Sequence, residues 1–471
     1  MCFLTWICVT QTRVWYLNGA KVMMIRKMLL SSTVLLAISG QVALAENFSD
    51  MLARAYEVNP GLRANYIAIS EANEAVPTAN ALIKPSFDAN ISLGIEGSDV
   101  EQGGISQDGA GHSASAALIA TQPLYTFGRY DAALGQALAA SDTAILGFQA
   151  KIQQTLSTAA KAYLDVIESS EEVKLNENNV NVLKSQLKAT QDRFDVGELT
   201  RTDVALAESA LAGSESELEG ARAKLAAASA AYEEVSGAQP GTVSLPESFS
   251  FLPTSLIAAQ DIAKTQALEI KLSDMALKSV EDEIASKKAA DNPIVNLNGN
   301  ASLSDKDVLS STKTHGFSVT AQLSVPLYNG GARESDVRKA MSKKVRLQRE
   351  REQTLREVAS NVSSTWARLE SARKTIVSSK AAVRAARLAM QGTREEFNVG
   401  ERTLVDVLDA EQKFLNASVQ LVRAEVGWYK AQVELALVVG SLDEDNLNLK
   451  VSKYDVTALR PKPSGLWQLM K

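Results

Sequence analysis

The sequence repeats itself at a constant offset of 203 residues. Pro123-Leu124-Tyr125 recurs as Pro326-Leu327-Tyr328, and Phe194-Asp195-Val196-Gly197-Glu198 recurs as Phe397-Asn398-Val399-Gly400-Glu401. Gly237 recurs as Gly440, so no insertion or deletion separates the two copies over this stretch. Loops tolerate changes in length, whereas a long element with both ends in register does not. The repeat therefore predicts two matched, very long elements, each with a fixed start and a fixed turn.

The first 45 residues have the pattern of a targeting segment. Residues 24–27 form a short basic region with Arg26 and Lys27, residues 28–38 form a mainly apolar region, and Ala43-Leu44-Ala45 is a small-residue cleavage signal before Glu46. We therefore predict a signal peptide over residues 24–45 and interpret residues 1–23 as an over-long start, with translation beginning at Met23 or Met24. The alternative is one membrane helix, but 11 apolar residues are too few to span a bilayer.

Composition excludes several classes of function. Both cysteines, Cys2 and Cys8, precede the cleavage signal, so the mature chain is expected to have no disulfide and no thiolate metal site. After cleavage the chain has 45 basic and 55 acidic residues, and a net charge of −10 argues against nucleic acid as a partner. Its two histidines, His112 and His315, stand alone, and no phosphate-binding or dinucleotide motif is present. We expect no enzyme activity, metal or cofactor.

Four segments alternate apolar and polar residues with a period of two, which is typical of strands with one apolar face. They are residues 86–95, 114–124, 294–303 and 317–325. The second is the weakest, although Leu118 and Leu124 keep its phase. Each segment is about ten residues long, as in tilted transmembrane strands, and Tyr125, Phe127 and Tyr328 gather at strand ends like an interfacial aromatic girdle. Alternation alone fits a soluble sheet equally well; the signal peptide and the Asn- and Ser-rich polar faces favour the membrane.

Four strands cannot close a barrel, and open sheet edges are not tolerated in lipid. The chain is therefore expected to oligomerise. Two copies would supply eight strands, which enclose only side chains, whereas three copies would supply twelve and leave room for a pore. The pore argument favours a homotrimer.

Long heptad patterns follow each strand pair. The first copy has no proline from Gly128 to Gly197 and places apolar residues at seven-residue steps, and the second copy does the same from Leu355 to Met390. About 69 residues at 1.5 Å per residue make a rod of about 100 Å. Gly197 and Gly400 suit left-handed helix ends, after which a second helix returns to about Gly237 or Gly440. An ordinary helical bundle is the alternative.

The predicted fold class is an α+β membrane protein, divided as follows. After the signal peptide come a helical segment (46–84), the first β-hairpin (85–126), the first long helical hairpin (127–239), an equatorial linker and helix (240–292), the second β-hairpin (293–328), the second long helical hairpin (329–440) and a C-terminal tail (441–471).

Beyond these patterns, the chain resembles the TolC family of outer-membrane exit ducts over residues 46–445. The two Pro-Leu-Tyr segments carry the resemblance, and so, above all, does Val399-Gly400-Glu401-Arg402-Thr403-Leu404-Val405-Asp406-Val407-Leu408-Asp409-Ala410. The resemblance implies a homotrimer with a twelve-stranded barrel in the lipid of a Gram-negative outer membrane, continued by a periplasmic α-helical coiled-coil barrel. It also implies docking with a periplasmic adaptor and an inner-membrane transporter, to export drugs, secreted proteins or both by tripartite efflux or type I secretion.

The resemblance further implies a channel gate. Asp406 and Asp409 resemble the constricting aspartates, and Arg402 resembles an arginine that pairs with Thr202 and Asp203 on the neighbouring hairpin. A tyrosine common in this network is Phe397 here, so the closed state is expected to be held less tightly. On the residues alone, the better interpretation of both aspartates is as surface carboxylates near a helix N-terminus, where the helix dipole favours them. The tips expected to contact the adaptor are Val196, Gly197, Glu198, Leu199, Val399, Gly400 and Glu401.

Two other classes of function compete with the duct. A periplasmic coiled-coil adaptor would need one hairpin in a β-rich frame rather than two hairpins with apolar strands. A coiled-coil adhesin, a structural protein without a pore, would not show the internal duplication.

Overall fold

The computed structural model describes residues 47–103, 105–307 and 311–459. The predicted signal peptide, residues 1–23 and the last twelve residues of the predicted tail lie outside this range. All described elements belong to one structural unit, Ala45–Lys471.

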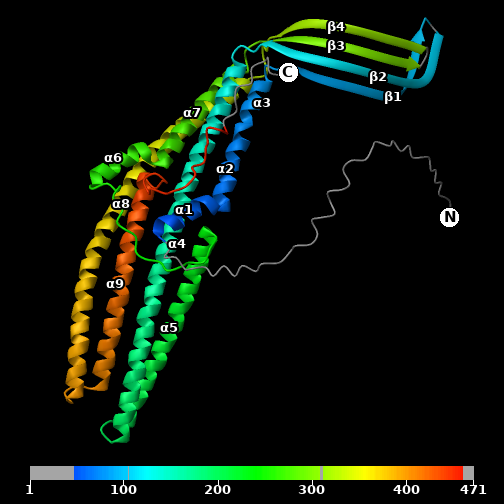
Figure 1. Ribbon diagram of the computed structural model, residues 1–471. Helices are drawn as coiled ribbons and strands as arrows, with labels where there is room; N and C mark the ends of the chain where they lie inside the picture. The colour runs from blue at the N-terminus through cyan, green and yellow to red at the C-terminus, as the bar shows by residue number, and fades with distance from the viewer. Residues whose placement is uncertain (1–46, 104, 308–310, 460–471) are drawn as a thin grey trace, which may run out of the picture. The chain divides into compact units, whose positions relative to one another are not determined.

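The elements follow one another in two similar series (Figure 1). The first series is α1 (Phe48–Val58), α2 (Pro60–Asn73), α3 (Ala75–Ala81), β1 (Ser86–Gln102), β2 (Ile105–Tyr125), α4 (Arg129–Asp195) and α5 (Arg201–Ser236). The second is α6 (Leu256–Gln266), α7 (Leu268–Ala289), β3 (Ile294–Asp307), β4 (Ser311–Ser324), α8 (Ala332–Asn398) and α9 (Leu404–Val439). Each series contains short helices, a strand pair and a long helical hairpin.

The long helices obey the repeat to the residue. α4 and α8 each have 67 residues, and α5 and α9 each have 36. At a rise of 1.5 Å per residue, α4 and α8 are each about 100 Å long. α8 begins and ends 203 residues after α4, and α9 begins and ends 203 residues after α5. This confirms the prediction of two matched rods. The constant offset therefore records two helices whose ends are fixed at a strand pair and at a turn.

The two hairpins bury their heptad residues to different extents. α4 packs along α5 and also lies against α7 and α9, while α8 packs along α9, α7 and α6. The heptad residues of α4 from Ile145 to Val180 are buried. In α8 only Val362 of this set is buried, and Leu355, Leu369 and the later members are half-buried. α8 thus keeps an apolar flank that the chain itself covers incompletely.

The main core joins the short helices, both hairpins and the tail. Met51, Leu62, Phe148, Tyr163 and Val433 are among its fully or almost fully buried members. Tyr163 donates a hydrogen bond from its hydroxyl to the carbonyl of Ser244 at 2.9 Å, which fixes the linker to α4.

The tail after Gly440 also packs on this core. The ring centroid of Tyr454 lies 5.3 Å from those of Tyr56 and Phe148 and 4.8 Å from that of Tyr66. The described part of the tail is therefore a structural element of the rod.

The four strands form one antiparallel sheet in the order β1-β2-β3-β4. The register aligns Ala89 with Leu118, Leu118 with Ala301, and Ala301 with Phe317, so one apolar face runs across all four strands. Most of its large side chains are more than half exposed, including Phe87, Ile91, Leu93, Leu118, Leu303, Phe317, Val319 and Leu323. Exposed apolar surface of this extent indicates a face that meets lipid rather than water.

The opposite face of the sheet is polar and internally hydrogen-bonded. Ser92 and Ser115 share a hydrogen bond of 2.7 Å, and Asn298 donates to Gln322 at 3.0 Å. Glu96 accepts from Ser113 at 2.9 Å and from Lys306 at 3.2 Å. This polarity fits the water-filled side of a barrel.

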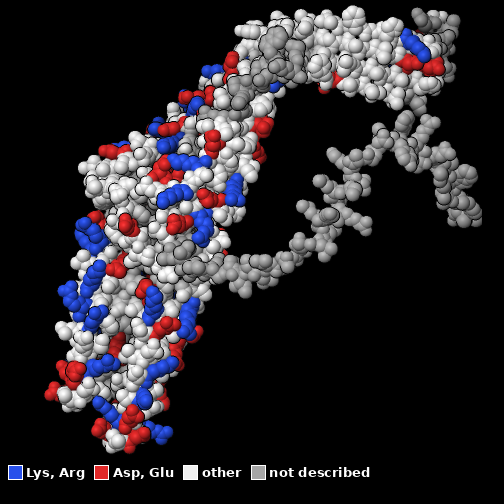
Figure 2. Space-filling model, in the orientation of Figure 1, with Lys and Arg blue, Asp and Glu red and all other residues white. Residues whose placement is uncertain are grey.

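The prediction of ten-residue strands is wrong. β1 has 17 residues, β2 has 21, and β3 and β4 have 14 each. Hydrophobic alternation stops near Ile95, but the ladder of backbone hydrogen bonds continues through polar residues such as Glu96 and Asp305. Figure 2 shows charged side chains spread over the helices, whereas on the sheet they gather mainly at one end. Periodicity therefore located the apolar band and missed the polar extensions.

A register shift ends the pairing of β2 with β3. Pro123 pairs with Asn296 and Tyr125 pairs with Val295, so Leu124 is the extra residue of a bulge. The prediction that Leu124 keeps the strand phase is therefore wrong, because Tyr125 takes the place beside Val295 on the apolar face. A proline that cannot donate to the ladder favours such a break.

We predict that Gly440→Ala destabilises the protein much more than Gly400→Ala. Both glycines have positive φ, 79° and 84°, so either alanine costs about 1–2 kcal/mol for its left-handed backbone. A Cβ at Gly440 would lie 2.5 Å from the carbonyl oxygen of Gln266, whereas no atom lies within 4 Å at Gly400. Overpacking should cost about a further 1–3 kcal/mol. Thermal unfolding followed by circular dichroism measures this, and equal Tm values would contradict it.

Candidate functional site

Each long hairpin turns through the same backbone motif. The Glu198 amide donates to the Arg193 carbonyl at 2.9 Å and the Gly197 amide donates to the Phe194 carbonyl at 2.9 Å, which is a Schellman motif. The second hairpin repeats it, with the Glu401 amide on Glu396 at 2.9 Å. Gly197 and Gly400 have φ of 83° and 84°, so the sequence placed both left-handed helix ends correctly.

The predicted tip residues face outward. Val196 and Val399 are 71% and 74% exposed, although both are apolar. The flanking Gly197, Glu198, Gly400 and Glu401 are also exposed, whereas Leu199 is half-buried against the cluster around Phe397. The tips thus present small apolar and acidic groups on a rigid turn.

Both return helices begin with a capping box, in which a Thr and an Asp satisfy each other's backbone amides. Asp203 accepts from the Thr200 amide at 2.9 Å and hydroxyl at 2.7 Å. Asp406 accepts from the Thr403 amide at 3.0 Å and hydroxyl at 2.7 Å. Hydrogen bonds from Thr403, and to a smaller extent the charge of Arg402, lower the pKa of Asp406. Asp406 is therefore both the third helical residue of the capping box and a fixed negative charge.

Arg402 is held within its own hairpin. Its Nε donates to Glu396 Oε2 at 2.8 Å. Thr202 is exposed, and the Asp203 carboxylate is occupied by Thr200. The structure of one chain does not test the bridge from Arg402 to Thr202 and Asp203 of a neighbouring hairpin, which stays a prediction.

Asp409 follows Asp406 by one turn, but its environment differs. Lys413 Nζ lies 2.6 Å from Asp409 Oδ2 as an i,i+4 pair. Because both side chains are more than half exposed, solvent screens this pair. The predicted gate does not include Lys413, although its i,i+4 spacing from Asp409 indicates an ion pair on a helix.

Phe397 lies where the two hairpins meet. It is 9% exposed and packs with Ala207 of α5 and with Leu404 and Val407 of α9. The guanidinium carbon of Arg193 in α4 lies 5.4 Å from the ring centroid, a cation–π contact worth about 0.5–1 kcal/mol at an exposed site. Phe397 therefore joins the hairpins by packing and by its ring face, without a hydroxyl.

Sequence reasoning missed a buried acid close to the residues predicted to form the gate. Glu411 in α9 is 5% exposed, and its Oε1 accepts from Arg394 Nη2 at 3.1 Å. Its Oε2 is buried without a hydrogen-bond partner. Burial raises the pKa of Glu411, and the nearby charge of Arg394 opposes this only in part. The signal in the sequence was a difference between the two copies: Arg394 is replaced by Gln191 in the first copy. The acid equivalent to Glu411 in that copy, Glu208, is exposed.

Over the described ranges, no three acidic, histidine or cysteine side chains converge as metal ligands. In the same residues, no helix combines the length and apolar character needed to cross a membrane.

The geometry is that of a duct: a sheet with one lipid-facing and one polar side continues into two long helical hairpins with exposed tips. The chain is an outer-membrane exit duct and not an enzyme. It belongs to the outer membrane efflux protein family, whose family model matches residues 51–238 and 261–441.

Known proteins support this assignment. The chain is 28% identical over 454 residues to the outer membrane efflux protein BepC of Brucella suis, covering 93% of this chain and 94% of BepC. It is 25% identical over 423 residues to the outer membrane protein TolC of Vibrio cholerae, covering 87% and 95%. The crystal structure of the Campylobacter jejuni outer membrane channel CmeC superposes with a TM-score of 0.72 at 15% identity, covering 88% of each chain, which shows a shared fold.

We predict that Glu411→Gln stabilises the protein at about pH 7 but not at about pH 4. A raised pKa means that the folded chain binds the proton more tightly, so the free energy of unfolding falls as pH rises from 4.5 through the folded pKa. A tenfold difference in proton affinity between the folded and the unfolded chain corresponds to about 1.4 kcal/mol. Gln at position 411 keeps an oxygen that accepts from Arg394, but it has no carboxyl group that titrates.

Denaturant unfolding at the two pH values measures the effect of this substitution. Glu208→Gln changes the equivalent, exposed residue of the first copy and serves as the control. A stability difference between Glu411→Gln and the parent that does not vary with pH would contradict the prediction.

Proposed function

We propose that three copies of this chain form one duct through the outer membrane and across the periplasm. The observation that carries the proposal is the sheet: its apolar face is exposed, and β1 and β4 are its two edge strands. Pairing β4 of each copy with β1 of the next would close a twelve-stranded barrel and satisfy both edges. The same arrangement would cover the half-buried apolar flank of α8.

The duct would receive its cargo from an inner-membrane transporter through a periplasmic adaptor. Six hairpin tips per trimer would form the docking ring, and the exposed Val196 and Val399 supply apolar contacts at its rim. Gly197 and Gly400 leave space for the adaptor because no atom lies within 4 Å of the position of an added Cβ. The family and its relative BepC are both named for efflux, which favours drugs as the cargo, and the same duct would suit secreted proteins in type I secretion.

The periplasmic end would carry the gate. Arg402 would exchange Glu396 for Asp203 and Thr202 of the adjacent hairpin in the closed trimer, while Phe397 and Arg193 hold the hairpins of one chain together. Three-fold assembly would bring Asp406 and Asp409 of each chain into an acidic constriction that favours cations, as charged rings do in cation channels. Loss of Arg402 is therefore expected to open the duct.

We predict that Asp406→Asn weakens cation selectivity more than Asp409→Asn. Lys413 lies 2.6 Å from Asp409 and offsets its charge, whereas Asp406 is bonded mainly by the neutral Thr403. Asn keeps an oxygen for the capping box, so the helix start is retained. Reversal potentials in planar bilayers under a KCl gradient measure selectivity.

Asp203→Asn removes the same charge from the equivalent cap of the first hairpin and is the control for this experiment. Its open-state selectivity should equal that of the parent. An unchanged reversal potential for Asp406→Asn would remove Asp406 from the constriction.

We predict that the double substitution Val196→Ser and Val399→Ser abolishes export but not assembly. Both side chains are mostly exposed, so little packing is lost within the chain. Drug resistance and protease secretion, restored by the parent chain in a Gram-negative strain that lacks its own duct, measure export and also identify the cargo class. Heat-modifiable migration of the detergent-extracted trimer measures assembly.

Leu245→Ser, in the linker and away from the tips, is the matched control and should export normally. Full resistance in the tip variant would exclude docking through Val196 and Val399. Failure of the parent chain to restore any export would refute the proposed function itself.

A further inference from the structure

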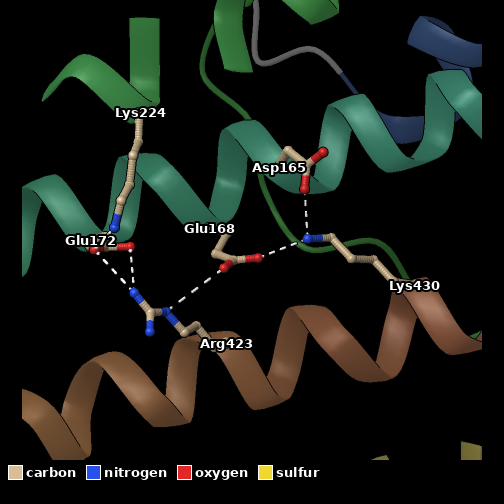
Figure 3. Close-up of polar contacts among 6 residues, drawn as sticks. All are labelled: Asp165, Glu168, Glu172, Lys224, Arg423 and Lys430. Atoms are coloured by element: carbon tan, nitrogen blue, oxygen red, sulfur yellow. Dashed lines mark hydrogen bonds and ion pairs between the residues drawn. The ribbon is translucent and has the colours of Figure 1, made fainter. Parts of the chain in front are cut away.

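Six charged side chains from three helices meet between the two long hairpins (Figure 3). Three acids come from α4, one base comes from α5 and two bases come from α9; they are Asp165, Glu168, Glu172, Lys224, Arg423 and Lys430. We call this set the inter-hairpin charge cluster. None of its members belongs to the tip or to the gate described above.

Two bases of α9 hold the three acids of α4. Lys430 Nζ lies 2.6 Å from Asp165 Oδ1 and 2.8 Å from Glu168 Oε2. Arg423 Nη2 donates to both carboxylate oxygens of Glu172 at 3.3 Å, and its Nε lies 4.0 Å from Glu168. These contacts therefore join the second hairpin to the first.

Lys224 completes the cluster within the first hairpin. Its Nζ donates to Glu172 Oε1 at 2.8 Å, from α5 to α4. Lys224 therefore shares the electrostatic environment of the cluster without linking the two hairpins, which makes it a natural control.

The cluster is shielded enough to hold a fixed geometry. The side chains of Glu172, Glu168 and Lys430 are 12%, 25% and 30% exposed. Burial opposes ionisation of Glu172, but hydrogen bonds from Lys224 and Arg423 outweigh it and lower the pKa. Burial likewise opposes charge on Lys430, and Asp165 and Glu168 reverse this and raise its pKa. Both shifts favour the charged forms of Glu172 and Lys430. Ion pairs that share partners in a network couple more strongly than isolated surface pairs.

The internal repeat shows that these charges belong to one interface only. At an offset of 203, Asp165, Glu168 and Glu172 of α4 correspond to Arg368, Ser371 and Thr375 of α8. Arg423 and Lys430 of α9 correspond to Gly220 and Ala227 of α5. Arg368 is already paired within its own hairpin, with Glu434 at 2.9 Å.

The repeat also indicates where the equivalent interface lies. α4 packs against α9 within the chain, so in the proposed trimer α8 would pack against α5 of the next copy. At that interface Ser371 and Thr375 would lie opposite Gly220 and Ala227, so these positions would form no acid–base pairs. At these positions the acid–base contacts join the hairpins within the chain and would be missing between copies.

We propose that the inter-hairpin charge cluster is a fixed joint, which keeps the two hairpins of one chain together and confines the opening movement to the segments between the joint and the tips. Two helical segments connect the joint to the tips: α4 from Glu172 to its end, and α9 from its start to Arg423. Each is roughly 30 Å long. The movable part thus includes Phe397, Arg402 and Asp406. Above the joint, the hairpins of one chain move as a pair, and any rearrangement falls at the junction between copies.

This inference rests on the proposed duct and gate, and the experiment separates the two. Single-channel conductance in planar bilayers is recorded for the parent, for Arg402→Ser, and for Arg402→Ser combined with Arg423→Gln. We expect conductance to rise from the parent to Arg402→Ser, and to rise again when Arg423→Gln releases the joint. Lys224→Gln in the Arg402→Ser background removes one charge from the cluster but leaves the link intact, and should match Arg402→Ser alone.

The joint is overturned if Arg423→Gln adds no conductance, or if Lys224→Gln adds as much. If Arg402→Ser conducts like the parent, the gate assignment fails; the joint is then judged by Lys430→Gln alone, which should still conduct more than the parent, and an unchanged conductance overturns it. Lys430→Gln also replaces Arg423→Gln if that variant does not yield a heat-modifiable trimer. If the parent chain forms no channel at all, the duct itself is refuted, and with it the joint.

Discussion

Backbone groups left unpaired in the hydrocarbon core of a bilayer are so costly that a membrane sheet must have no open edge. In this chain β1 and β4 are the edges of a four-stranded sheet whose apolar face is exposed. Much of the remaining architecture depends on meeting that requirement through copies of the same chain. The edge strands β1 and β4 must be able to pair with each other between copies, and the two hairpins that follow the strand pairs must reach the same depth. The equal lengths of α4 and α8, and of α5 and α9, are the structural form of this condition.

The internal duplication gives the two hairpins the same backbone structure, and their different side chains give them different roles. Both tips share the Schellman turn and the Thr–Asp capping box, so the turns are interchangeable in geometry. The second hairpin alone has Arg402, Asp409 and the buried Glu411 beside its turn. The first hairpin alone carries the acids that Arg423 and Lys430 hold. Different side chains on the same backbone thus give the two hairpins different charges and different contacts.

The proposed gate residues show how structural and electrostatic roles combine at one position. Asp406 stabilises the start of α9 by accepting from Thr403, and these same hydrogen bonds keep its carboxylate ionised. An alanine at this position would lose both properties, whereas Asn would lose only the charge. Phe397 shows the reverse case: the hydroxyl expected in such a network is absent, and Arg193 meets the face of the ring instead. The link between hairpins is retained with a different interaction.

The sequence by itself determined the elements, because period-two alternation, heptads and the constant offset are properties of the chain read in order. It placed the turns at Gly197 and Gly400, and it assigned the apolar sides of the strands. It missed the polar ends of the strands and the bulge at Leu124, since a hydrogen-bond ladder and its register are not recorded in hydrophobicity. Only the tertiary structure decided which charges meet. Glu172 and Arg423 are 251 residues apart, and Glu411 is buried while Glu208 is exposed, because packing between helices, not local sequence, sets their surroundings.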